Sequence, residues 1–147
     1  METSNALDLQ IQRKSLLIVQ AQFQQALAQK EEATRLYLEA ALLEEKIAAH
    51  FQQERNFDDA AISLFSAASC YKKAGALAKA LALAKEAVAQ SGSAEFVTEI
   101  QSFIEANEAL SNSAPRRSLR GIVRNGAIHP FESGVLVEGE LVTINAA

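Results

Sequence analysis

The sequence is poor in the residues that build disulfides, metal sites and membrane spans. It contains one cysteine, no tryptophan and two prolines among 147 residues. Because Cys70 stands alone, no intrachain disulfide can form and a cysteine-based metal site is not expected. The longest apolar run near the N-terminus, Leu16 to Val19, is far too short to cross a bilayer, and residues 1–10 lack the basic segment of a secretory signal. We therefore expect a cytoplasmic protein that does not enter a membrane.

Patterns typical of catalysis are also missing. His50 and His129 are far apart in the sequence and lack the spacing of metal ligands. Asp58 and Asp59 stand at a predicted helix start, where carboxylates complement the helix dipole. Neither a Gly-x-Ser-x-Gly elbow nor a phosphate-binding glycine loop occurs. We expect no enzyme, and no cofactor or metal.

Charge is modest and unevenly distributed. The net charge is −4; residues 1–110 carry 10 Lys/Arg and 15 Asp/Glu, whereas residues 111–147 carry 4 arginines and 3 glutamates. An acidic body makes nucleic acid an unlikely main ligand, because phosphate binding requires a positive surface. The arginines at the junction fit either contact with an acidic partner or an ordinary solvated linker.

Helix-forming residues dominate the first 110 positions of the sequence. Residues 5–110 contain no proline and only two glycines, and apolar residues recur there with helical spacing. Gly75 suits the left-handed position that ends a helix, Asn56 or Asp58 can cap the third helix, and Ser93 the last. The pattern predicts four to five helices with breaks near residues 29–31, 54–57, 74–76 and 91–94. The first break lacks a helix breaker, so one continuous helix through it is the alternative.

The first predicted helix carries large apolar residues at spacings of three, four and seven, as one buried face requires. The residues of this predicted core face are Leu9, Leu16, Val19, Phe23, Ala26 and Leu27.

Three predicted helices share a pair of alanines seven residues apart. The members of a pair lie two turns apart on one face, where small side chains let neighbouring helices approach closely. The predicted helix-packing pairs are Ala33 and Ala40, Ala60 and Ala67, and Ala80 and Ala87.

The segments RNFDDAAISLFSAA and AGALAKALALAKEA resemble the second helix of a tetratricopeptide repeat, with Phe57 and Leu77 in the apolar turn position and Tyr71 as the aromatic that closes a first helix. The alanine pairs follow one another after 27 and 20 residues, whereas that family repeats at about 34 residues. The resemblance covers residues 11–91 and implies a mainly α fold, an antiparallel array of helical hairpins. A small antiparallel bundle, similar to the three-helix domains that bind short peptide helices in trafficking proteins, is the alternative.

A stack of helical hairpins leaves one concave face, which is the usual binding surface of helical-repeat proteins. Its predicted lining is polar and would hold a short protein or peptide segment, although the same residues also fit an ordinary solvent-exposed face. The candidate partner-binding residues are Gln24, Lys46, His50, Gln53, Lys72 and Lys73.

The C-terminal stretch has the pattern of β-strands. Asn125-Gly126 between two apolar stretches predicts a two-residue hairpin turn, and GELVTI alternates as a third short strand. Three short strands cannot bury enough surface to fold alone, so we expect them to pair with a second copy, a partner or the helical body. A homodimer is the favoured outcome. The candidate dimerisation residues are Ile122, Val123, Ile128, Phe131, Val142 and Ile144.

The tail is also similar to a small prokaryotic antitoxin-like family, in which an apolar strand, Asn-Gly, an Ile strand with proline and a Glu-Gly before a Val-rich strand follow one another. The family's Leu-Pro ahead of Glu-Gly is replaced here by Leu136-Val137. The matching residues are Ile122, Val123, Asn125, Gly126, Ile128, Pro130, Glu132, Leu136, Glu138, Gly139, Val142 and Ile144.

The sequence therefore predicts a helical domain over residues 1–110, a linker over 111–118 and a small β-forming tail over 119–147. The expected function is a non-enzymatic protein–protein interaction module, an adaptor or scaffold with a tail for dimerisation or docking. The alternative is an antitoxin-like regulator whose tail pairs with a toxin or assembles on DNA.

Overall fold

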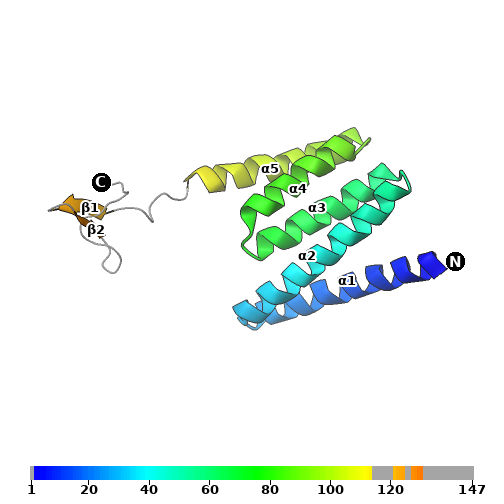
Figure 1. Ribbon diagram of the computed structural model, residues 1–147, viewed down its shortest axis with the longest axis horizontal. Coiled ribbons are helices and arrows are strands. Elements are labelled where there is room, and N and C mark those ends of the chain that lie inside the picture. Colours follow the sequence, from blue (N-terminus) through cyan, green and yellow to red (C-terminus); the bar gives the residue numbers. More distant parts are fainter. Residues whose placement is uncertain (1, 114–120, 125–126, 131–147) are drawn as a thin grey trace. The chain divides into compact units, whose positions relative to one another are not determined.

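The computed structural model describes residues 2–113, 121–124 and 127–130 (Figure 1). The helical part is mainly α as predicted, and its helices pack in sequence order, an arrangement consistent with a helical repeat. The break at residues 27–29 separates two helices, so the continuous-helix alternative is wrong. The helices are α1 (Glu2–Ala26), α2 (Lys30–Gln53), α3 (Phe57–Lys73), α4 (Leu77–Gln90) and α5 (Ala94–Ser113).

Contacts between alternate helices show that the array has two layers. The ring of Phe65 in α3 meets the rings of Phe96 and Phe103 in α5 edge to face, with centroids 5.7 and 5.2 Å away. On the other side of the array, the Gln52 amide of α2 donates to Glu86 of α4 at 3.5 Å. These contacts place α3 and α5 on one side of the array and α2 and α4 on the other. Figure 1 shows the five helices following one another in sequence order.

The alanine pairs occupy the same place in each of three helices. They are the fourth and eleventh residues of α2, α3 and α4. Ala33 is 5% exposed and the other five members are fully buried. The unequal spacing of 27 and 20 residues follows from helix length, because α2 has 24 residues, α3 has 17, and each is followed by the same short turn. Each pair therefore marks one helix, not one two-helix repeat.

The three turns that join α1 to α4 have the same backbone geometry. Their middle residues, Ala28, Arg55 and Gly75, have φ of 61°, 60° and 87°. In each turn the next backbone N–H donates to the carbonyl five residues earlier, at 2.8–2.9 Å, which is the Schellman arrangement that closes a helix. The left-handed position predicted for Gly75 is confirmed.

Two predicted helix caps are also confirmed. The Asn56 side chain accepts a hydrogen bond from the backbone N–H of Asp59 at 3.3 Å. The Ser93 hydroxyl accepts one from the N–H of Phe96 at 3.1 Å. Both caps satisfy backbone donors that the first turn of a helix leaves without an intrahelical partner.

The predicted core face of the first helix is wrong. α1 packs on α2 through Leu17 and Ala21, which are 6% and 0% exposed. All six residues of the predicted face are exposed instead. Periodicity detected an apolar face correctly, but α1 has two such faces, and spacing alone does not say which of them meets α2.

The described part of the tail is a short hairpin. β1 (Gly121–Arg124) and β2 (Ala127–Pro130) pair antiparallel, with Gly121 opposite Pro130 and Arg124 opposite Ala127. The predicted third strand and the candidate dimerisation residues Phe131, Val142 and Ile144 lie outside the described residues. α5 continues to Ser113, so the first residues of the expected linker are helical. The chain divides into two compact units, residues 1–107 and 108–147.

The turn geometry generates a prediction about stability. A left-handed backbone costs a non-glycine residue about 1–2 kcal/mol, and a glycine is more flexible in the unfolded chain, so Arg55→Gly should raise the free energy of unfolding by about 0.5–1 kcal/mol. No described residue forms an ion pair with Arg55, so nothing else is removed. Urea unfolding followed by circular dichroism measures the change.

Gly75→Ala is the matched control. A Cβ at Gly75 would meet nothing within 4 Å, so only its φ opposes the alanine. The variant should lower the free energy of unfolding by about 1 kcal/mol. A destabilised Arg55→Gly would contradict the left-handed assignment at residue 55.

Candidate protein-binding surface

α1 carries two seams of residues with heptad spacing. The seam that faces α2 consists of half-buried or buried residues, and the second seam consists of exposed ones. The seams are offset by two residues, and since each residue turns a helix by about 100°, they lie on nearly opposite sides of α1. The inner seam is Leu7, Gln10, Lys14, Leu17, Ala21 and Gln24. The outer seam is Leu9, Gln12, Leu16, Val19, Phe23 and Ala26.

Large apolar side chains along the outer seam are exposed over more than half of their surface. We call this set, with the adjoining Leu27, the α1 stripe. Its members and exposed fractions are Leu9 (65%), Leu16 (57%), Val19 (59%), Phe23 (60%) and Leu27 (52%). Isolated exposed apolar residues are common on proteins, whereas a contiguous row along one helix marks an interaction surface.

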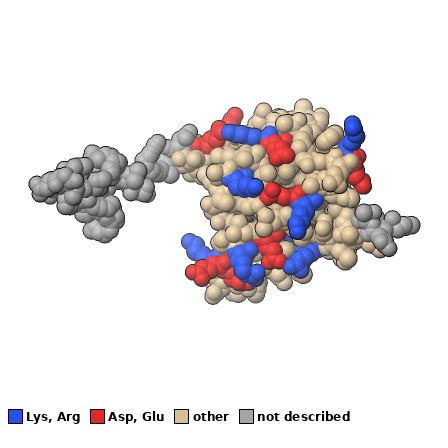
Figure 2. Space-filling model, in the orientation of Figure 1, with Lys and Arg blue, Asp and Glu red and all other residues tan. Residues whose placement is uncertain are grey.

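The C-terminal part of α1 and the following turn carry no charge at all. Residues 15–29 contain no Asp, Glu, Lys or Arg, and their polar residues are glutamines and one serine. Elsewhere, positive and negative side chains lie intermixed over the face drawn in Figure 2, without a patch of one sign. An uncharged, apolar segment of this kind matches the composition of interface cores, from which charged residues are depleted.

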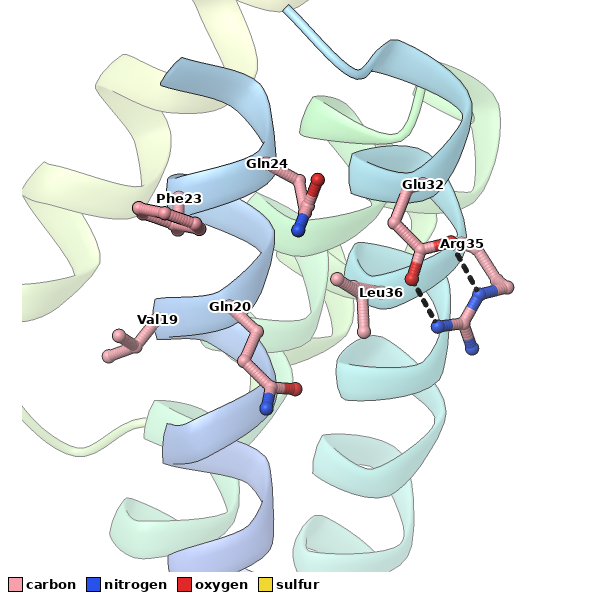
Figure 3. Close-up of a pocket in the computed structure, with 7 residues that line it drawn as sticks. All are labelled: Val19, Gln20, Phe23, Gln24, Glu32, Arg35 and Leu36. Carbon is pink, nitrogen blue, oxygen red and sulfur yellow. Dashed lines mark hydrogen bonds and ion pairs between the residues drawn. The ribbon is translucent and has the colours of Figure 1, made fainter. Parts of the chain in front are cut away.

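A groove between α1 and α2 adjoins the stripe. Its volume is about 480 Å³. In Figure 3 Gln20 and Gln24 extend from α1 toward α2, where Leu36 faces them, while Val19 and Phe23 point to the other side of α1. The lining residues are Val19, Gln20, Phe23, Gln24, Glu32, Arg35 and Leu36.

An ion pair closes the α2 side of this groove. Arg35 donates from Nε to Glu32 Oε1 at 3.2 Å and from Nη2 to Glu32 Oε2 at 2.5 Å. The hydrogen bond from Arg35 lowers the pKa of the Glu32 carboxyl below its usual value. The groove thus combines an apolar wall, glutamine amides that donate and accept hydrogen bonds, and a neutralised pair of charges at its rim.

The residues predicted from sequence to bind a partner are not gathered around one cavity. Gln24 lines the groove. Lys73 lines a different cavity of about 350 Å³, where its Nζ lies 5.6 Å from the centre of the Tyr37 ring. Lys72 lies over the ring of Phe103, and His50 Nε2 is 3.4 Å from Glu54. Lys46 and Gln53 are exposed on α2.

The residues of the α1 stripe were predicted as the one apolar face of the first helix, and the signal for the inner seam was missed. A second heptad series, two residues out of step with the first, runs along the same helix. Together with the uncharged stretch over residues 15–29, it indicates a helix with apolar surface on both sides. Such a helix is expected to be covered on both sides.

A buried ion pair orients α1. Lys14 Nζ lies 3.1 Å from Glu44 Oε2, whose side chain is 1% exposed, and the Ser66 hydroxyl donates to the same oxygen at 2.5 Å. The three side chains come from α1, α2 and α3. Because a buried carboxylate needs its cation and hydrogen bonds, this contact directs the Lys14 side of α1 inward and therefore the stripe outward.

Breaking this pair should destabilise the fold. Lys14→Met leaves the Glu44 carboxylate buried without a cation, and we expect the free energy of unfolding to fall by about 3 kcal/mol. The double variant Lys14→Met/Glu44→Leu removes both charges and should return to within about 1 kcal/mol of the original protein. Urea unfolding of the three proteins measures these differences.

The control for this prediction is a surface pair. Arg13 and Glu39 are 2.6 Å apart with side chains 63% and 36% exposed, so Arg13→Met should cost less than about 1 kcal/mol. A Lys14→Met variant no less stable than Arg13→Met would show that the buried pair does not orient α1.

Cys70 places a thiol in the interior of the helical array. It is a free thiol, 4% exposed, on α3. Burial, followed by the nearby Glu44 carboxylate, raises the pKa of this thiol to about 11. The group is thus held as a neutral thiol, which suits a small buried apolar residue and not a nucleophile.

The raised pKa predicts slow alkylation. At pH 8 the thiolate fraction of folded Cys70 should be about 100-fold below that of an unperturbed thiol, and burial slows reagent access further. Iodoacetamide labelling should therefore be at least about 100-fold slower in buffer than in 6–8 M urea, a typical denaturing range. Equal rates in both conditions would place Cys70 at the surface.

Within the described residues, no group of three or more His, Cys, Asp or Glu side chains is arranged to hold a metal ion. In the same part of the chain, no helix is long and apolar enough to span a bilayer.

Comparison of the chain with protein-family models, curated proteins and solved structures finds no match. Functional assignment therefore depends on the surface itself.

Proposed function

We propose that this protein is a non-enzymatic protein–protein interaction module, an adaptor or scaffold, which binds its partner along the α1 stripe. The observation that carries the proposal is the row of five apolar side chains exposed over 52–65% of their surface, on a helix whose opposite seam is already packed. Water contact with this row is unfavourable, and association with an apolar surface removes it.

The partner surface that fits best is an amphipathic helix. The stripe runs from Leu9 to Leu27 on a regular helix, a length of about 27 Å at 1.5 Å per residue. Leu9, Leu16 and Phe23 are spaced by seven residues, which is the repeat that meets the side chains of a second helix. The adjoining groove provides room for side chains at the edge of that helix, as in helix-in-groove recognition.

Tetratricopeptide-like packing is the finer fold that we propose for residues 11–91. It is supported by the repeated Schellman turns and by the packing of neighbouring helices in sequence order, whereas the alanine pairs recur in each of α2, α3 and α4 and do not mark a two-helix repeat. α3, its turn and α4 span residues 57–90, a length that matches the family's repeat of about 34 residues. The binding surface proposed here lies on the first helix and differs from the concave lining suggested by the sequence.

The antitoxin-like alternative depends on the tail, of which only the short hairpin is described, and no feature of the described residues favours it. The intermixed charges seen in Figure 2 suit protein partners better than nucleic acid. A cytoplasmic setting remains part of the proposal.

A binding experiment with charge substitutions tests the function. Val19→Asp/Phe23→Asp places two charges in the α1 stripe without altering the inner seam. Capture from native lysate by the full-length chain is quantified by mass spectrometry, with further copies of the chain itself counted among the captured proteins. It should recover at least one protein that the variant retains at least about 10-fold less, as expected for the loss of interface centres.

Ile62→Asp is the matched control, because Ile62 on α3 is 54% exposed and lies outside the stripe. It should retain the captured protein. Equal recovery by the original chain and by the stripe variant would overturn the proposed surface.

A further inference from the structure

We infer that the partner of the α1 stripe is the α1 stripe of a second copy of this chain, so that α1 pairs with α1 across a two-fold axis. This inference rests on the proposed function, since it names the partner of the same surface.

The charge distribution of α1 favours self-association. A two-fold interface places the same patch of both copies together, so any net charge in the patch is set against a similar charge. Residues 15–29 carry no charge, and they contain four of the five stripe residues. Two copies can therefore bring these segments together without electrostatic repulsion and without desolvating a charged group.

The polar residues beside the stripe are self-complementary. A glutamine amide both donates and accepts hydrogen bonds, so it can pair with the same residue type of another copy. Gln12 and Gln20 are exposed beside the stripe, and Gln24 extends into the groove. A lysine or glutamate at these positions would instead require a partner with the opposite charge.

The area available is sufficient for a dimer. Five side chains exposed by more than half offer on the order of 500 Å² of apolar surface, at the upper end of what a monomer leaves uncovered. Two such patches and their flanking residues remove roughly 1,000–1,500 Å² from water, which falls within the range of specific interfaces.

The position of α1 in the array supports the same partner. α1 packs on α2 through its inner seam, helped by a hydrogen bond from the Tyr37 hydroxyl to Gln25 and by the Arg13–Glu39 ion pair, whereas its outer seam is exposed. The outer seam has the same heptad spacing as the inner seam. The inner seam already packs on α2 of the same chain. A second copy's α1 would cover the outer seam and join two arrays through a helix pair of the same kind.

The dimer inferred here differs from pairing through the C-terminal strands, because its contacts belong to α1. Substitutions in the two regions separate these arrangements. Val19→Glu/Phe23→Glu places two charges in the α1 stripe. Ile62→Glu places a charge at an exposed control position on α3, and Ile122→Glu places one in the hairpin.

Sedimentation velocity of the full-length protein over a micromolar concentration series tests the inference. The original chain should reach twice its mass of 15.9 kDa. Val19→Glu/Phe23→Glu should raise the dimer dissociation constant by about 100-fold, whereas Ile62→Glu and Ile122→Glu should change it by less than about threefold. A monomeric original chain, or a dimer that persists in the stripe variant, would overturn the inference.

Photocrosslinking from position 23 tests the same contact without introducing a charge. Phe23→p-benzoylphenylalanine retains an aromatic ring and forms a covalent bond to whatever contacts it under illumination. In the purified protein the crosslinked product should have twice the chain mass, and the bond should map to α1 of the second copy. A crosslink to any other region of the chain contradicts the α1 pair.

The same probe separates failure of this inference from failure of the proposed function. Crosslinking to a different protein in native lysate, with a monomeric purified chain, overturns the α1 pair and leaves the protein-binding function standing. Crosslinking to no protein in either setting overturns both.

Discussion

The close approach of neighbouring helices at buried alanines is the constraint on which the array depends. α2, α3 and α4 each place alanines at their fourth and eleventh residues, where a larger side chain would force the helices apart. Each alanine buries little surface, so larger apolar side chains supply most of the buried area. An example is Phe65 of α3, whose ring meets Phe96 and Phe103 of α5. The same turn geometry recurs at the three junctions from α1 to α4, and the alanine pairs recur at the same positions of α2, α3 and α4.

α1 is built differently, and this difference explains the exposed surface. Its contact with α2 uses Leu17 and Ala21, and its orientation depends on the buried pair of Lys14 and Glu44, which Ser66 completes from α3. Rotating α1 by half a turn would bury the apolar stripe, but it would also turn Lys14 away from Glu44. The buried Glu44 carboxylate would then face an uncharged seam and would have no cation to pair with. The electrostatic requirement of one buried carboxylate therefore decides which of two apolar faces remains available to a partner.

The buried polar side chains hold the helices in position. Glu44 holds α1 to α3 through α2, the Tyr71 hydroxyl donates to Glu45, and Cys70 is kept as a neutral thiol by burial. In contrast to these interior contacts, the α1 stripe on the surface is apolar and uncharged. This contrast is the basis of our proposal that the protein acts through association, with specificity from the shape of one helix face and from the glutamine amides that flank it.

The amino-acid sequence by itself determined the helices, the last three of their breaks and two of their caps, because glycine and capping residues act over a few neighbouring positions. It also located the alanine pairs. Tertiary structure alone decided that a turn forms at Ala28, where no helix breaker stands, and that the inner seam of α1 faces α2. Both outcomes depend on residues distant in the chain: the packing of α1 on α2 stabilises a left-handed alanine, and a carboxylate thirty residues away from Lys14 selects the buried face. Helical periodicity records that a face is apolar, but only the three-dimensional arrangement determines what covers it.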